Sequence, residues 1–201
     1  MKTTAWLLAA LFAFSGFLAP AVQAQPTFNA NLFGLMKGDG KDATRLHFGA
    51  SKENVASLLG QPTKTERLVD EIEGGFYEVV YYRANKLYFK KNSLQSFELH
   101  DNLLIYGKSF ETAYRIGTKI YQVTKNSSKQ AATSANYLLN GKPLVNFKVD
   151  PKPGKSRNIN YSLIAVSYPK FGDTIADASA LQLLFNANNQ LAVLAYSEDN
   201  D

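Results

Sequence analysis

Histidines, carboxylates and a glycine-containing segment are the groups in this chain whose chemistry needs to be considered first. His47 and His100 are the only imidazoles among 201 residues, and a Ser–His–Asp triad needs one of them as its base. Neither lies in a nucleophile-elbow or His-x-x-x-His context. Neighbouring side chains on a strand diverge, so His100 and Asp101 are not expected to act together. We interpret both histidines as surface or strand-end residues and assign no catalytic residue.

Carboxylates cluster in the first half of the chain and offer a different chemistry. A hydrolase can use two carboxyl groups held roughly 5–9 Å apart, but these residues also fit the solvent face and turn of a strand pair, which we favour. The cluster consists of Glu66, Asp70, Glu71, Glu73 and Glu78. Asp173 and Asp177 lie in a predicted loop without the dense Asp-x-Asp-x-Asp spacing of a calcium loop, so no metal site is predicted.

The segment Leu103–Ser109 imitates the end of a phosphate-binding loop, because Gly107 and Lys108 follow a predicted strand. The motif also requires a glycine five residues before Gly107, and that position is Asn102. We therefore interpret Ser109 as a helix N-cap. No nucleotide or other cofactor is predicted.

Composition excludes several further classes of function. The chain has no cysteine, which removes thiol nucleophiles, thiolate metal sites and redox chemistry. Its net charge of +5 is mildly basic and below that of a dedicated nucleic-acid binder. With 13 Phe and 11 Tyr, the chain can be held together by core burial without disulfides.

The first 24 residues have the composition of a secretory leader. Lys2 gives a positive start, residues 5–20 are almost wholly apolar, and small residues stand at positions 22 and 24. We predict a signal peptide over residues 1–24, cleaved between Ala24 and Gln25. Because the apolar run is shorter than the about 20 residues of a spanning helix, a retained anchor is the less favoured alternative. There is no cysteine at the cleavage point, so the sequence has no lipid attachment site there.

Aromatic and basic residues are interleaved along residues 76–91. Successive side chains of a strand point to opposite faces, so one half of these residues is expected in the core and the other half on an exposed surface. Tyr and Arg are enriched at binding hot spots. We therefore predict a binding face, and its candidate residues are Tyr81, Tyr82, Arg83, Lys86, Tyr88, Lys90 and Lys91.

These residues must be positioned by one clear helix and a series of strands. Ser51 is a good N-cap, Val55, Leu58 and Leu59 form an apolar stripe, and Gly60 can close the helix. Asn140-Gly141 predicts a hairpin turn. Aromatic and β-branched composition predicts strands at 65–70, 76–83, 87–90, 94–100, 103–106, 137–139, 144–149, 161–168, 180–186 and 191–196.

The pattern restarts in the second half of the chain. Gly107–Gly117 repeats the Gly, Ser, Glu, apolar and closing Gly spacing of residues 49–60, and 183–193 resembles 87–97 with one residue inserted. Capped helices and Asn-turn hairpins also recur by chance, but two matches in the same order favour an internal duplication. We therefore expect an α+β fold of two tandem modules, each a helix packed on an antiparallel β-sheet. The expected parts are a flexible lead-in at 25–45, module 1 at 46–106, and module 2 at 107–198 with a long insertion near 125–158.

A capped helix that ends in Leu-Leu-Gly-x-Pro before a strand meander resembles the module of the small outer-membrane assembly lipoproteins and of beta-lactamase-inhibitor proteins. The matching residues are Gly49, Ser51, Val55, Leu58, Leu59, Gly60 and Pro62. The resemblance covers the first module, and extends to Gly107–Gly117 if the duplication is real. The chain lacks the lipid-bearing cysteine of the lipoproteins and the disulfides of the inhibitors. The resemblance implies a fold and a non-catalytic binding role, without a target.

Together these observations favour an exported, non-enzymatic binding protein that recognises a protein or cell-envelope component through an antiparallel sheet surface. The alternatives are a small secreted hydrolase with paired carboxylates and a structural envelope component. We expect a bacterial, periplasmic or extracellular protein, with no nucleic-acid partner and no membrane span after cleavage.

Overall fold

The computed structural model describes residues 25–40, 44–69, 74–123, 137–171, 174–175 and 179–198. The predicted signal peptide, Asp70, Glu71, Glu73, Asp173 and Asp177 lie outside these residues, as does part of the expected insertion. No helix in the described part of the chain is long and apolar enough to cross a membrane.

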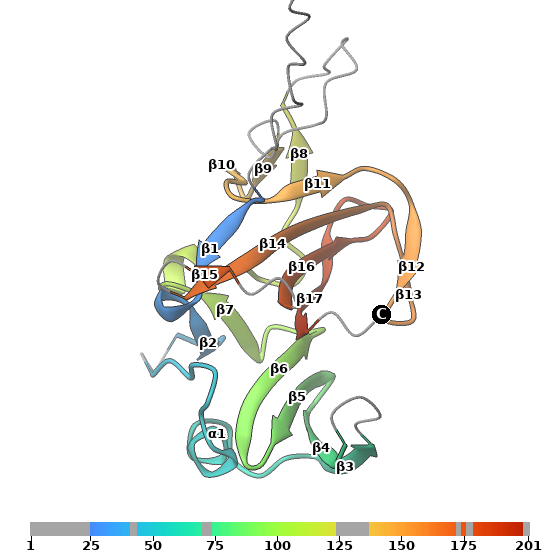
Figure 1. Cartoon of the computed structure of the whole chain (residues 1–201). Helices are drawn as coiled ribbons and strands as arrows, with labels where there is room; N and C mark the ends of the chain where they lie inside the picture. Colours follow the sequence, from blue (N-terminus) through green and yellow to red (C-terminus); the bar gives the residue numbers. More distant parts are fainter. Residues whose placement is uncertain are drawn as a thin grey trace, which may run out of the picture.

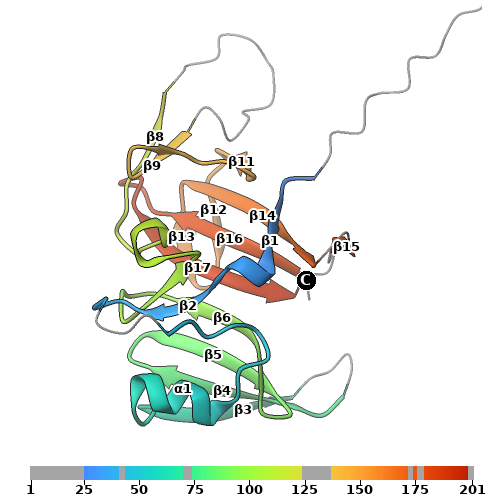
Figure 2. The same cartoon turned by 90° about the vertical axis from the view of Figure 1, so that its left-hand side faces the viewer.

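One ten-stranded β-sheet dominates the described residues (Figures 1 and 2). Its main path, in spatial order, is β1 (Thr27–Asn29), β14 (Leu163–Phe171), β16 (Ser179–Phe185), β17 (Leu191–Glu198), β6 (Ser93–Leu99), β5 (Asn85–Lys90), β4 (Phe76–Tyr82) and β3 (Lys64–Val69). Strands β11 (Lys148–Asp150) and β15 (Thr174–Ile175) pair with β14. The β1–β14 pair is parallel and the other pairs are antiparallel, so the sheet is mixed.

Smaller elements surround this sheet. They are the pair β2 (Gly34–Lys37) and β7 (Leu104–Gly107), the three-stranded sheet of β8 (Ile120–Gln122), β9 (Tyr137–Leu139) and β10 (Lys142–Pro143), and the hairpin β12 (Gly154–Ser156) and β13 (Ile159–Tyr161). The helical elements are α1 (Lys52–Leu59) and the 3₁₀ turns η1 (Ala30–Leu32) and η2 (Phe110–Thr112).

The predicted first helix is confirmed as α1. The Ser51 hydroxyl accepts a hydrogen bond from the Asn54 backbone N–H, and Gly60 ends the helix with a φ of +83°. This φ lies in a region where L side chains are strained, which explains the glycine. Val55 is the buried residue of the helix, and Figure 2 shows α1 at the β3–β5 end of the sheet.

The expected fold class of two tandem helix-on-sheet modules is wrong. Within the described residues α1 is the only α-helix, and the segment expected to form the second helix contains the three-residue turn η2. Ser109 makes no side-chain capping bond. The backbone of Tyr114 instead donates to the Tyr106 carbonyl at 2.9 Å. The chain turns back so closely that a Cβ on Gly107 would lie 2.6 Å from the Ala113 Cα, so tertiary pairing overrides the helical spacing.

The two halves of the chain share one sheet and one main core. Strand β6 pairs with β17, with Leu99 opposite Leu194 and Phe97 opposite Tyr196. Residues 25–45, expected to be a flexible lead-in, contain β1, η1 and β2, and Phe28 and Leu35 are buried in the core. The periodic signal is weak there because β1 has only three residues, too few for a readable alternation.

The hairpin β12–β13 covers part of the opposite sheet face. Ile159 and Tyr161 pack against a small cluster of Leu184, Val193 and Ala195, which is separate from the main core. The sheet is therefore covered on one face by the main core and, over β16 and β17, on the other face by this hairpin. We call the second face over β3–β6 the outer face.

Candidate ligand-binding pocket

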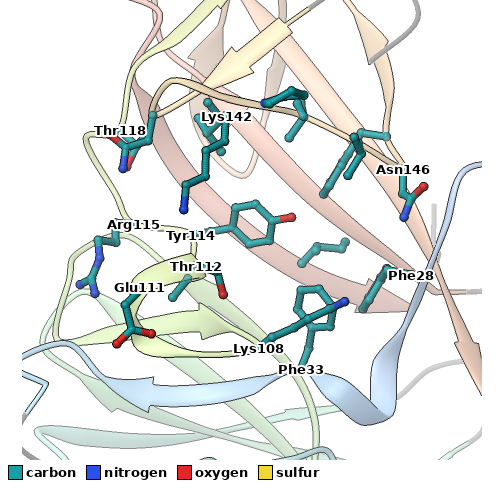
Figure 3. A pocket seen from close by; sticks show the side chains of 18 of the residues that line it. Phe28, Phe33, Lys108, Glu111, Thr112, Tyr114, Arg115, Thr118, Lys142 and Asn146 are labelled. Carbon is teal, nitrogen blue, oxygen red and sulfur yellow. The ribbon is translucent and has the colours of Figure 1, made fainter. Parts of the chain in front are cut away.

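A cavity of about 310 Å³ lies between two loop regions beside the end of the large sheet (Figure 3). One wall is the segment from Lys108 to Thr118, which contains η2. The facing wall is the β9–β10 hairpin and the chain that follows it, from Leu139 to Phe147. Phe28 and Asn29 of β1, Phe33 at the end of η1, and Leu181 of β16 complete the lining.

Aromatic and aliphatic residues form about half of the lining of this pocket. Phe28 and Phe33 meet edge to face with ring centroids 5.1 Å apart, and Tyr114 meets Phe147 in the same way at 5.9 Å. Such pairs fix ring orientation as well as burying apolar area. The apolar and aromatic lining residues are Phe28, Phe33, Ala113, Tyr114, Leu139, Pro143, Leu144, Val145, Phe147 and Leu181.

The rim of the pocket carries three cations and one carboxylate. The cations are Lys108, Arg115 and Lys142, and Glu111 is the only carboxylate among the described lining residues. Arg115 donates to the Phe110 carbonyl at 2.8 Å and its guanidinium lies 4.1 Å from the Phe110 ring centroid. The Lys108 ammonium lies 5.4 Å from the Phe33 ring centroid.

Lys142 is the least engaged of these cations. Its side chain extends from the β9–β10 hairpin toward Tyr114 and the cavity (Figure 3). No hydrogen bond or ion pair joins its ammonium to another described residue. The turn that presents it has φ of +51° at Asn140 and +74° at Gly141, the conformation that Asn-Gly hairpins favour.

Glu111 and Tyr114 have fixed protonation states near neutral pH. A hydrogen bond from its own backbone N–H, a second with Ser109 and the nearby charges of Arg115 and Lys142 lower the pKa of Glu111. Burial raises the pKa of Tyr114 to about 12. Glu111 is therefore an anion, and Tyr114 a neutral phenol that can donate a hydrogen bond.

The pocket walls are held by hydrogen bonds that do not depend on a ligand. The Asn102 side chain accepts from the Ile116 N–H at 2.8 Å and donates to the Ile116 carbonyl at 2.9 Å. Gly117 donates to the Leu191 carbonyl at 2.8 Å, and Leu144 to the Tyr137 carbonyl at 2.8 Å. The pocket is therefore largely preformed, as small-molecule sites usually are.

The structure brings together four of the seven predicted binding-face residues. Tyr81, Lys86, Tyr88 and Lys90 lie on the outer face of β4 and β5, each partly exposed. The placing of Tyr82 on this face is corrected by the structure. Its side chain is 3% exposed, faces the core, and donates to the Gly60 carbonyl at 3.2 Å.

The other two predicted face residues lie in turns at opposite ends of β5. Arg83 has a φ of +57° in the β4–β5 turn, and Lys91 has a φ of +51° in the β5–β6 turn. Both are exposed. They do not join the four residues on the outer face into one compact patch.

Charges on the outer face are largely paired with one another. Glu98, 6% exposed, accepts from Arg157 at 2.7 Å, from Tyr88 at 2.9 Å and from Lys86 at 3.1 Å. Burial opposes ionisation of Glu98, but its bonds with His100 and Lys86 and the charge of Arg157 lower its pKa overall.

A second, more exposed network lies on the same face. Glu66 accepts from the Tyr81 hydroxyl at 2.5 Å and pairs with Lys64. The bond to Glu66 raises the pKa of Tyr81 to about 12. These interactions satisfy polar groups internally, so this face offers fewer unpaired groups to a partner than the pocket rim does.

The residues first considered for catalysis do not converge in the described structure. Glu66 lies on the outer face, while Glu78 lies on the opposite face and pairs with Lys52 of α1. His47 bonds the Phe33 carbonyl through Nδ1 at 2.8 Å. His100 lies directly after β6 and bonds Glu98, which agrees with the strand-end interpretation.

Sequence reasoning did not find the pocket, because its lining comes from separate segments with no shared motif. Lys108 and Arg115 lie in the segment for which the sequence spacing predicts a helix. The Asn140-Gly141 turn before Lys142 was the one local signal that pointed to a pocket element.

Comparisons with known proteins add no relative from which a function can be transferred. No protein-family model, curated protein or solved structure matches the chain.

Proposed function

We propose that this chain is an exported, non-enzymatic binding protein that holds a small ligand in the pocket between Lys108–Thr118 and the β9–β10 hairpin. The observation that carries the proposal is a preformed cavity of about 310 Å³ whose lining joins aromatic and aliphatic side chains with polar and charged ones. This combination is typical of small-molecule sites, and the volume lies at the lower end of their range.

Two features support binding over hydrolysis. The alternative hydrolase needs two carboxyl groups facing one substrate, and Glu111 is the single carboxylate among the described residues that line the cavity. The hydrogen bonds and charges around Glu111 lower its pKa, whereas a general acid needs a raised one.

Export rests on the N-terminal sequence, so the proposed compartment is the periplasm or the extracellular space. Recognition of a protein or envelope component by the outer face remains a prediction, as does a structural role in the envelope. We favour the pocket because its rim includes a cation, Lys142, without a bonded partner among the described residues.

The proposal is tested with N-phenyl-1-naphthylamine, an uncharged apolar fluorophore whose emission rises in apolar surroundings. We expect saturable binding to the protein. Thr112→Trp should abolish most of it, because Thr112 lines the cavity and the larger ring fills it. Thr65→Trp is the matched control, since Thr65 is an exposed residue of β3. Absence of saturable binding, or equal loss in both variants, would contradict the proposal.

A further inference from the structure

We infer that the pocket selects a single-chain amphiphile with an anionic head group and a short apolar tail. This inference rests on the proposed function, that the cavity is a ligand site. It adds the chemical class of the ligand, which follows from the size of the cavity, the charge of its rim and the positions of its charged and aromatic residues.

Cavity size limits the enclosed part of the ligand. The cavity of about 310 Å³ lies at the lower end of the range of about 300–1,000 Å³ for sites that enclose small molecules. A single straight chain of eight to ten carbons suits a site of this size. The acyl chains and head group of a two-chain phospholipid exceed it.

Charge at the rim favours an anion. Three cations, Lys108, Arg115 and Lys142, face one ionised carboxylate, Glu111, so the rim has a net positive charge. A cationic ligand would meet like charges, while an anion would gain charge-assisted hydrogen bonds. Tyr114 adds a neutral hydroxyl, directed into the cavity in Figure 3.

Two of the three cations lie apart from the Phe28–Phe33 pair. Figure 3 shows Arg115 and Glu111 at one side and Lys142 above Tyr114, while Phe28 lies at the other side and Phe33 lies below, beside Lys108. A ligand with its head group near Lys142 and Arg115 can therefore lay its tail against the Phe28–Phe33 pair. The tail gains from burial of apolar area, and the head group remains at the opening.

The same arrangement leaves Lys142 available for the head group. Lys108 lies against the Phe33 ring and Arg115 against the Phe110 ring, so both have an aromatic neighbour to hold them. Lys142 has the charge of Glu111 nearby but no hydrogen bond or ion pair with a described residue, and it follows the Asn140-Gly141 turn. Its ammonium is the group most able to bind an added anion.

Isothermal titration with four probes of equal chain length tests this inference: octanoate, octyl phosphate, 1-octanol and octyltrimethylammonium. We expect octanoate or octyl phosphate to bind at least ten-fold more tightly than 1-octanol, and octyltrimethylammonium to bind most weakly. The tighter of the two anions identifies the head group as carboxylate or phosphate. Higher salt should weaken binding of the anion more than that of the alcohol.

Lys142→Gln is the diagnostic variant, and Lys155→Gln, at an exposed position of β12 outside the cavity, is its control. Lys142→Gln should weaken anion binding about three- to ten-fold and leave 1-octanol binding unchanged. Lys155→Gln should change neither. Because the Lys142 side chain is exposed and has no hydrogen bond or ion pair with a described residue, the substitution should leave the fold intact.

The outcomes separate the two proposals. Equal affinity for the anions and 1-octanol, preference for the cation, or no effect of Lys142→Gln would overturn the inference while the pocket remained a ligand site. Failure of all four probes and of the apolar fluorophore would overturn the proposed function itself.

Discussion

Glu98 is a buried carboxylate surrounded by charged and hydrogen-bonding partners. Its side chain is almost fully covered, yet it bonds Lys86, Arg157, His100 and Tyr88. A buried carboxylate is costly unless such partners compensate it. Glu98 therefore ties the β12–β13 hairpin, through Arg157 in its turn, to β5 and β6.

Glu98→Gln should lower the free energy of unfolding by about 2 kcal/mol at pH 7, because it leaves several cations without their anion. The folded-state pKa of Glu98 is lowered, so its contribution is present above the unfolded-state pKa and is lost as pH falls through the folded-state pKa. Urea denaturation of both proteins between pH 7 and pH 3 should show a difference that shrinks as the pH falls.

Glu78→Gln is the control for this experiment. Glu78 forms one ion pair with Lys52, and both side chains are 33% exposed, so the cost should stay below about 1 kcal/mol. A Glu98→Gln variant as stable as Glu78→Gln, or a difference from the wild type that grows toward low pH, would refute the role given to Glu98.

At the scale of elements, two serines with the same sequence context have different structures. Ser51 caps α1 through the Asn54 N–H, whereas Ser109 makes no capping bond and its hydroxyl lies 3.0 Å from that of Thr112. Both fit the Ser-x-Glu pattern of a helix start. Only one begins a helix, because only one is followed by a chain that can bury an apolar helical stripe.

This difference predicts unequal effects of the same substitution. Ser51→Ala should reduce the free energy of unfolding by about 1 kcal/mol through loss of the cap. Ser109→Ala should cost less than about 0.5 kcal/mol, since Ser109 lies at the surface of a three-residue turn. Thermal or urea denaturation of the two variants measures both. Equal costs near 1 kcal/mol would mean that Ser109 caps a helix after all.

Elements that depend on nearby residues could be predicted, and those that depend on distant pairing could not. Ser51 and Gly60 mark α1 locally, and aromatic and β-branched composition predicts strands at the positions of β4, β5 and β6. The parallel pairing of Thr27 with Tyr168 joins segments far apart in sequence, and no local pattern encodes it. The pocket could not be predicted for the same reason, because Phe28, Tyr114 and Phe147 are distant in sequence and are brought together by the folded structure.

At the scale of the whole molecule, the β6–β17 pair makes the two sequence halves one structural unit. Phe97 is fully buried and contacts the rings of Phe48, Tyr106 and Tyr196. Its neighbours therefore come from both halves. This is why a division into two independently packed modules does not describe the sheet or the core.

Shared packing predicts a single cooperative unfolding transition for the described part of the chain. Phe97→Ala should destabilise the protein by about 3–5 kcal/mol, and the slowest amide exchange at Leu87 and at Leu183 should accelerate to the same extent. These residues belong to β5 and β16. Acceleration at Leu87 alone would indicate that the halves unfold separately.

The most direct test of a ligand site in the pocket is a map of amide chemical shifts during titration with octanoate. The account predicts saturable changes concentrated at Tyr114, Arg115, Lys142 and Phe147, with little change at Tyr81 and Tyr88 on the outer face. Changes centred on the outer face, or none that saturate, would contradict the assignment of the pocket as the binding site.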